Sequence, residues 1–136
     1  MQKSIFLALL LACSTSQASE WVSVGKSADG TKEWFIDASS IRISKSIRRA
    51  WIKTVFAPHT QQDTVLHSGK WLAHLVEHDV FNCGEEKAGI ETITAYYEGG
   101  GNDSAPYDSK ATPMELVPPD TAQTAELKFI CAWKPK

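Results

Sequence analysis

Two histidines and a glutamate stand close together in the stretch HLVEH, from His74 to His78. The pattern H-x-x-E-H is the zinc signature of the inverted metalloproteases. That chemistry requires a helix, because only there do residues four apart lie one above the other and converge on one ion. The motif therefore predicts a small zinc hydrolase, acting through His74, Glu77 and His78, only if this stretch is helical.

The flanking residues favour a strand instead. A Ser-Gly turn signal precedes the stretch, and residues 80–83, which read VFNC, follow it. In a strand His74 and His78 share a face but stand roughly 13 Å apart, at about 3.3 Å per residue. Zinc bonds of about 2 Å cannot span that gap, and Glu77 points to the opposite face. We therefore assign no catalytic residue, no metal and no cofactor, and keep the zinc hydrolase as a remote alternative.

Basic residues cluster at the entry to the most strand-like part of the chain, and two tyrosines precede its Gly-rich stretch. The basic cluster is typical of a patch for an acidic ligand or a glycosaminoglycan, or of a solvated edge that resists pairing with another strand. The Gly-rich stretch has the composition of a recognition loop, and equally of an ordinary surface loop. The candidate binding patch consists of Arg42, Lys45, Arg48, Arg49, Tyr96 and Tyr97.

The first residues have the pattern of a secretory signal peptide. Lys3 supplies the positive charge, Ile5–Ala12 is an unbroken apolar run too short to span a bilayer, and small residues follow. We expect cleavage after Ala18, so that residues 1–18 are a signal peptide and 19–136 a single domain. Removing 18 of the 136 residues leaves 118. Because LLAC resembles a lipobox, acylation of Cys13 is the minority alternative.

Charge and cysteine content limit the function classes further. The formal net charge is −2 and the isoelectric point about 6.1, which argues against nucleic acid as a partner. No later apolar run reaches membrane length, so we expect no transmembrane span in the mature chain. Cleavage leaves Cys83 and Cys131 as an even pair, which in an oxidising compartment most simply forms one disulfide.

The periodicity of the mature chain predicts consecutive strands followed by one helix. The expected strands are residues 20–25, 32–37, 48–58, 71–83 and 90–99, with a short return at 114–119. Residues 38–46 are expected to cross irregularly, and 99–113 to form a loop. A helix is expected from about Pro119 to Cys131, capped by Asp120, although Leu127, Phe129, Cys131 and Trp133 also alternate as a strand would. This layout is typical of an α+β domain in which an antiparallel sheet carries a helix on one face.

An ordered set of segments resembles the surface-adhesin protein E-like family of bacterial envelopes. The segments are EWVSVGKSADGTKEWFIDASSI, RRAWIKTVF, VEHDVFNC, AYYEGGG and LVPPDTAQTAELKFIC, and they cover essentially the whole mature chain. The resemblance implies a sheet of about six strands with a C-terminal helix tied to it by a disulfide between Cys83 and Cys131. This chain departs from the family pattern by running past Cys131 into AWKPK.

The resulting functional expectation is an exported, non-enzymatic envelope domain, located in the periplasm, on the outer membrane or outside the cell. Its expected partner is a protein, either a host matrix protein or an envelope protein. An accessory or structural envelope protein without a host ligand is the alternative, and a homodimer is an open alternative for its assembly. The sequence alone names no ligand.

Overall fold

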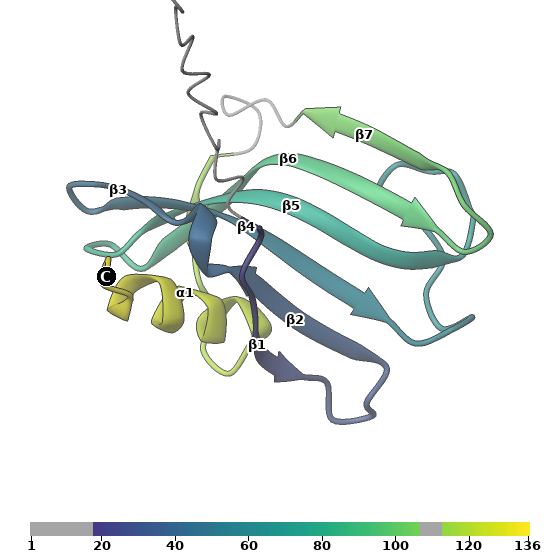
Figure 1. Cartoon of the computed structure of the whole chain (residues 1–136), viewed down its shortest axis with the longest axis horizontal. Coiled ribbons are helices and arrows are strands. Elements are labelled where there is room, and N and C mark those ends of the chain that lie inside the picture. Colours follow the sequence, from purple (N-terminus) through teal and green to yellow (C-terminus); the bar gives the residue numbers. More distant parts are fainter. Residues whose placement is uncertain (1–17, 107–112) are drawn as a thin grey trace, which may run out of the picture.

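The computed structural model describes residues 18–106 and 113–136, and the predicted leader with Cys13 lies outside them. The elements in chain order are β1 (Trp21–Lys26), β2 (Lys32–Asp37), the 3-10 turn η1 (Ala38–Ser40), β3 (Arg42–Ser44), β4 (Ile47–Phe56), β5 (Leu72–Asn82), β6 (Lys87–Tyr97), β7 (Asn102–Pro106), β8 (Glu115–Leu116) and α1 (Ala122–Ala132). Six strands lie side by side in the order β1-β2-β4-β5-β6-β7 (Figure 1). Every neighbouring pair is antiparallel, which confirms the predicted α+β fold.

The strands form where β-branched and aromatic residues alternate with polar ones, as a half-buried pleated surface requires. The central strands β5 and β6 each have 11 residues and follow one another through a short turn. The first hairpin turns at Gly30, which adopts a φ of +72° that a side chain would disfavour. Beyond the end of β2, the short strand β3 pairs with the first part of β4, where Arg42 lies opposite Arg49.

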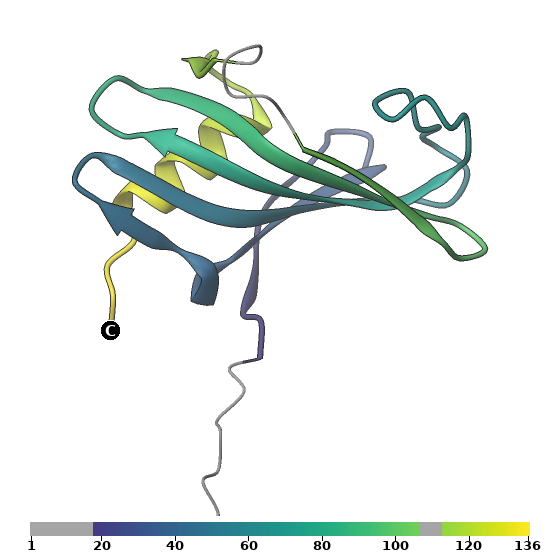
Figure 2. The ribbon, with the colours of Figure 1, turned by 90° about the horizontal axis from the view of Figure 1, so that it is seen from above.

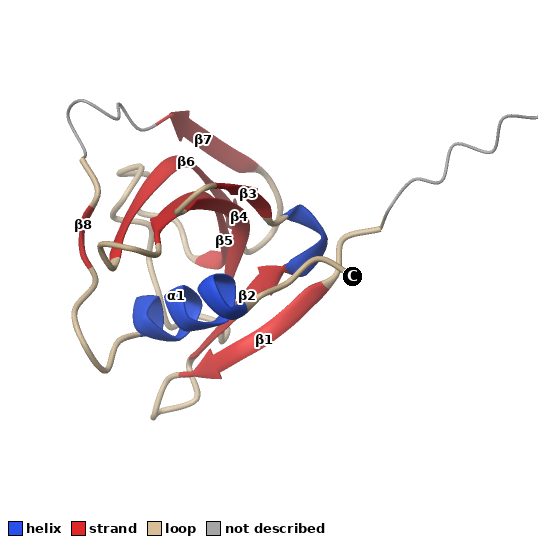
Figure 3. Cartoon of the chain, turned by 90° about the vertical axis from the view of Figure 1, so that its left-hand side faces the viewer, coloured by secondary structure: helices blue, strands red, loops and turns tan. Residues whose placement is uncertain are grey.

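One face of the sheet, here called the inner face, carries the core. It is the face on which Ile36, Ile52 and Ile93 are buried. The sheet curves around α1, which covers one end of this face (Figure 3). Residues 57–71 cover the other end, where Leu66 packs against a second buried cluster. The core is therefore single-sided: all of its large buried residues lie between the sheet and these two segments.

The helix begins later than the sequence predicts, and Asp120 is not its cap. Thr121 caps α1 instead, with its hydroxyl accepting a hydrogen bond from the Thr124 amide at 3.2 Å. An N-cap residue needs an extended backbone, which Thr121 has, whereas Asp120 lies in the left-handed region with a φ of +57°. No described helix is long and apolar enough to cross a membrane.

Two stretches expected to be irregular contain strands. Residues 102–106 form β7, an edge strand that pairs with β6. Asn102 lies opposite Tyr96 at one end of this pairing, and Pro106 lies opposite Thr92 at the other. Residues 38–46 contain η1 and β3 rather than an unstructured crossing. The Gly, Asn and Ser content of 99–106 predicts a loop locally, but three glycines of positive φ turn the chain back so that the next residues meet an unpaired edge.

The C-terminal end of α1 is attached to the sheet by covalent and polar contacts. Cys83, directly after β5, and Cys131 form the predicted disulfide with an S–S distance of 2.02 Å. Arg48 of β4 donates hydrogen bonds from Nη1 to the carbonyl oxygens of Ile130 at 2.5 Å and Trp133 at 2.7 Å. A cation at this position also opposes the negative end of the helix dipole. The helix end is thus fixed from two neighbouring strands.

Replacing Cys83 and Cys131 together with alanine should lower the free energy of unfolding. The two residues are 48 positions apart in sequence. Closing such a loop stabilises a domain by about 4 kcal/mol in the chain-entropy model. Urea unfolding of the double variant and of the reduced wild-type protein should show the same loss. A loss below about 1 kcal/mol in both would contradict a stabilising role of the link.

Candidate functional site

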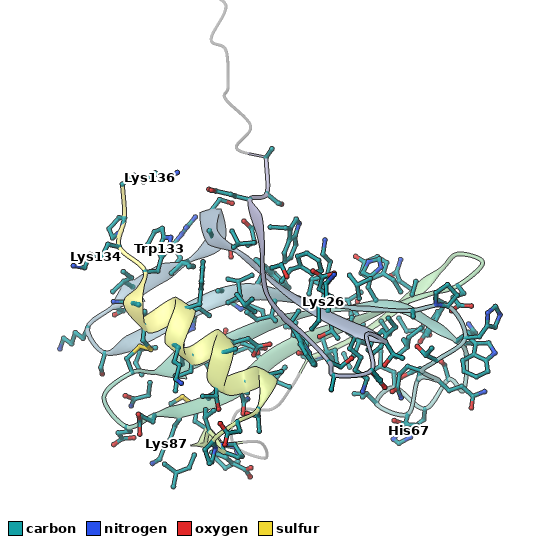
Figure 4. The ribbon with its side chains drawn as sticks, turned by 90° about the horizontal axis from the view of Figure 1, so that it is seen from below. Lys26, His67, Lys87, Trp133, Lys134 and Lys136 are labelled. Carbon is teal, nitrogen blue, oxygen red and sulfur yellow. A yellow bond between two sulfur atoms is a disulfide. The ribbon has the colours of Figure 1, made fainter. Side chains whose placement is uncertain are left out.

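The face of the sheet opposite to α1, here called the open face, is the candidate functional site. None of the described elements lies over it: α1 is behind the sheet when the molecule is viewed from above (Figure 2) and in front of it when viewed from below (Figure 4). The strand register shows which residues of β1, β2, β4, β5 and β6 point toward this face. They include Trp21, Phe35, Arg49, Trp51, Lys53, Val55, His74, Val76, His78 and Tyr96. Trp51 and Val55 are 39% and 37% exposed, respectively. An uncovered sheet face with this much aromatic and aliphatic surface is typical of a binding site.

At one end of the open face, two rings and an ion pair form a connected group. The rings of Trp51 and His78 lie 4.7 Å apart between centroids. Arg49 donates from Nε to Glu91 Oε1 at 2.8 Å, and His78 Nδ1 lies 2.8 Å from Glu91 Oε2. The β-bulge between β5 and β6 at this point turns the Glu91 side chain toward both partners. The group holds Trp51 in place while leaving part of its ring exposed.

His74 and Tyr96 form a stacked pair at the other end. Their ring centroids are 4.4 Å apart and their planes 16° from parallel. Burial lowers the pKa of His74, and the positive charge of Lys53 lowers it further. The imidazole is therefore neutral at neutral pH, and the pair presents a flat ring surface without a charge of its own.

Lys53 lies between these two ends and carries the central positive charge. Its Nζ lies 4.2 Å from the centroid of the Trp21 ring and 5.4 Å from that of Phe35. Both distances allow a cation–π interaction, which orients the ammonium group without neutralising it. Lys53 thus gives an otherwise aromatic surface a fixed cation.

HLVEH lies inside β5, which confirms the predicted strand and separates the residues of the zinc motif. His74 and His78 are on the open face, whereas Glu77 is on the inner face, opposite Ile52 and Ile93. Within residues 18–106 and 113–136, no group of three metal-ligating side chains is arranged to hold an ion. The two histidines instead contact Tyr96, Trp51 and Glu91.

The structure distributes the predicted binding patch over different surroundings. Arg49 and Tyr96 are on the open face, and Arg42 lies opposite Arg49 in the neighbouring strand. Lys45 is exposed at the turn between β3 and β4. Arg48 faces the helix, where its guanidinium is bound to backbone oxygens. The six residues do not form one patch, because adjacent residues of a strand point to opposite faces.

Tyr97 is the other patch residue that faces inward, and it anchors residues 57–71. Its hydroxyl lies 3.1 Å from Asp63 Oδ2 and 2.9 Å from Asp103 Oδ2. Burial alone would raise the pKa of Asp63, but hydrogen bonds from Ser68, Leu66 and Tyr97 outweigh it and lower the pKa to about 2. Asp63 is therefore an ionised structural acceptor, and Tyr97 is part of the core.

Sequence reasoning missed the residues that make up most of the open face. Trp51, Lys53, His74 and His78 were each visible, but only as members of separate strands. The alternation of side chains between the two faces of the strands in residues 48–58 and 71–83 could have identified them. Once the residues on one face of each strand are assigned to the core, those between them must lie on the other face. Which strands lie next to each other is not visible in that alternation.

Comparisons with known proteins agree with this architecture. A family model described as Surface-adhesin protein E matches residues 21–132. A solved structure of Haemophilus influenzae protein E is 18% identical, with a TM-score of 0.56, over 87% of this chain and 88% of that chain. A crystal structure of protein E from non-typeable Haemophilus influenzae is 19% identical, with a TM-score of 0.53, over 90% and 82%. At such identity the likeness shows the fold, and the search of curated protein sequences gave no match.

Lys53→Met should raise the pKa of His74, because the variant removes the nearby positive charge and keeps an apolar side chain of similar length. Titration of the His74 ring by NMR measures the change. Lys32→Met, on the adjacent strand β2 with its Nζ near Phe56, is the matched control and should leave His74 unchanged. Equal effects of the two variants would contradict the electrostatic effect of Lys53 on His74.

Proposed function

The chain belongs to the surface-adhesin protein E family, and we propose that it is an exported, non-enzymatic domain that binds a protein partner through the open face. The observation that carries the proposal is the uncovered aromatic surface of Trp51, His74, His78 and Tyr96 on the side of the sheet away from the core. The family is one of surface adhesins rather than a class of enzymes. Tryptophan, tyrosine and arginine are also the residues that dominate binding energy in protein interfaces.

The dimensions of the open face suit a protein partner. The six strands have 49 residues together, and each residue covers about 3.3 Å along its strand and about 4.8 Å across the sheet. The resulting area, on the order of 800 Å², matches the roughly 800 Å² that each partner contributes to a standard protein interface. A surface of this size suits a folded partner better than a small molecule, which needs a concave pocket.

The charges on the open face indicate the character of that partner. Arg49 is balanced by Glu91, whereas Lys53 keeps its charge, with its Nζ 4.2 Å from the centroid of the Trp21 ring. Exposed Arg42 extends the positive character next to Arg49. We therefore expect a partner that presents apolar side chains together with carboxylates, such as an acidic segment of a host matrix protein or of another envelope protein.

Trp51→Ala should weaken binding without unfolding the domain. Truncating an exposed aromatic anchor costs about 2 kcal/mol, which is roughly a thirtyfold rise in Kd. Binding of the purified protein to a panel of immobilised matrix proteins, measured by surface plasmon resonance, provides the reference value. Thermal unfolding followed by circular dichroism should change little, because the ring is already 39% exposed.

Trp71→Ala is the matched control for this experiment. Trp71 is 38% exposed, but it lies before the first residue of β5 and contacts His59 in the segment 57–71. Its removal should leave Kd unchanged. Equal losses in the two variants, or no saturable binding to any matrix protein, would contradict the proposal and favour an accessory envelope role. If Trp51→Ala, but not Trp71→Ala, converted a dimer in solution to a monomer, the occupant of the face would instead be a second copy of the chain.

Mass spectrometry of the protein recovered from the envelope or the medium tests export. We expect a chain that begins at Ser19 and lacks two hydrogens relative to the reduced form, because Cys83 and Cys131 are linked. A diacylated chain beginning at Cys13 would replace the predicted cleavage after Ala18 with lipid anchoring. Recovery of the complete chain from the cytoplasm, with both thiols free, would contradict export.

A further inference from the structure

Three carboxyl groups meet beneath α1, at the centre of the contact between the helix and the sheet. Glu77 and Asp79 lie on the inner face of β5, and Glu126 extends from the middle of α1 toward them. Asp79 is 3% exposed and Glu126 6% exposed, so neither has more than slight access to water. Charged side chains are rarely buried this deeply without a partner of opposite charge.

No cation compensates the three carboxyl groups within the described residues. Arg48 is the basic residue on the same face of β4, but its guanidinium is bound to the carbonyl oxygens of Ile130 and Trp133. Asp79 Oδ1 has no hydrogen-bond partner among the described atoms. The acidic neighbour Glu91, on the opposite face, adds only negative charge.

The other groups packed around the carboxyls are apolar. Ile52 and Ile93 lie opposite Glu77, and Ala50 and Ile90 lie opposite Asp79. On α1, Leu127 and Ile130 belong to the buried apolar cluster of the inner face. Nothing in these surroundings favours the ionised form of a carboxyl group. The described residues also form no arrangement of three ligands that would let a metal ion neutralise the cluster.

Burial and mutual repulsion change the acidity of the whole group. Burial raises the pKa of Glu126 to about 8, and the charge of Glu77 adds to this rise. Burial also raises the pKa of Glu77 to about 6. The pKa of Asp79 lies well above its ordinary value because of burial and of the charges of Glu77 and Glu126. At neutral pH the cluster therefore retains bound protons.

We propose that Glu77, Asp79 and Glu126 form a proton-dependent latch that docks α1 on the sheet while the carboxyls are protonated and loosens it when they ionise. The helix contributes one carboxyl and the sheet two, so repulsion between them acts directly across the contact that holds the helix. When the latch opens, the disulfide at Cys131 keeps the end of the helix attached. The latch lies on the opposite side of the sheet from the open face and does not depend on the proposed binding function.

The direction of the pH effect follows from the raised pKa values. A carboxyl whose pKa is higher in the folded than in the unfolded state favours folding below the unfolded value of about 4. This contribution is lost as the pH rises through the folded values, from about 6 for Glu77 to about 8 for Glu126. Asp37 and Asp63, whose pKa values are lowered, titrate below this range and do not obscure it.

Glu126→Gln tests the latch, because glutamine keeps the size of the side chain and cannot ionise. In the wild-type protein the melting temperature should fall by roughly 5 °C or more between pH 5.5 and pH 8.5. In the variant the fall should be less than half as large, and the variant should melt above the wild type at pH 8.5. Hydrogen exchange of the amides of Ala122–Ala132, corrected for the intrinsic pH dependence, should show the same pattern confined to α1.

Glu86→Gln is the matched control, since it removes one negative charge from an exposed residue and should leave the pH profile unchanged. Asp79→Asn provides a second variant, in which the profile should also flatten. Carbon-13 NMR titration of the wild-type carboxyls needs no variant at all. The proposal is overturned if all three groups titrate near pH 4, or if Glu126→Gln and Glu86→Gln have the same profile as the wild type.

Discussion

The disulfide between Cys83 and Cys131 and the hydrogen bonds of Arg48 fix the end of α1 against the sheet. Among the described residues, no other α-helix covers the sheet. A domain of this size buries a smaller share of its surface than a large one, so each covering element matters for stability. One helix and residues 57–71 can cover only one face. The exposure of the other face follows from this limit.

The two faces consequently differ in chemistry. The inner face carries the acidic residues Glu77, Asp79 and Asp103, and Asp63 of the covering segment 57–71 is bound to Tyr97 of that face. The open face carries the aromatic rings and the cation of Lys53. Because the chain is acidic overall, a positively charged aromatic face stands out against the rest of its surface. If the chain binds a partner as proposed, electrostatic attraction would therefore act mainly at the side that the core does not need.

The strands could be predicted from the sequence where local signals were strong. Residues 32–37 were predicted with the bounds that β2 has. These bounds are sharp in the structure, because the chain turns at Gly30 before the strand and Asp37 caps η1 after it. The cap of α1 was assigned to Asp120 rather than Thr121 because both residue types cap helices, and only the backbone conformation distinguishes them. Strand β7 was missed because its residues have no strand propensity, and it forms only by pairing with β6.

The candidate site was less predictable than the fold for a physical reason that HLVEH illustrates. A spacing of four residues brings two histidines together on a helix, but in a strand it separates them along one face. Here that spacing gives each histidine a different aromatic neighbour from an adjacent strand, Tyr96 for His74 and Trp51 for His78. The intervening Glu77 turns inward to face the helix. The same five residues thus contribute to the open face and to the carboxyl cluster, and only the order of the strands reveals either role.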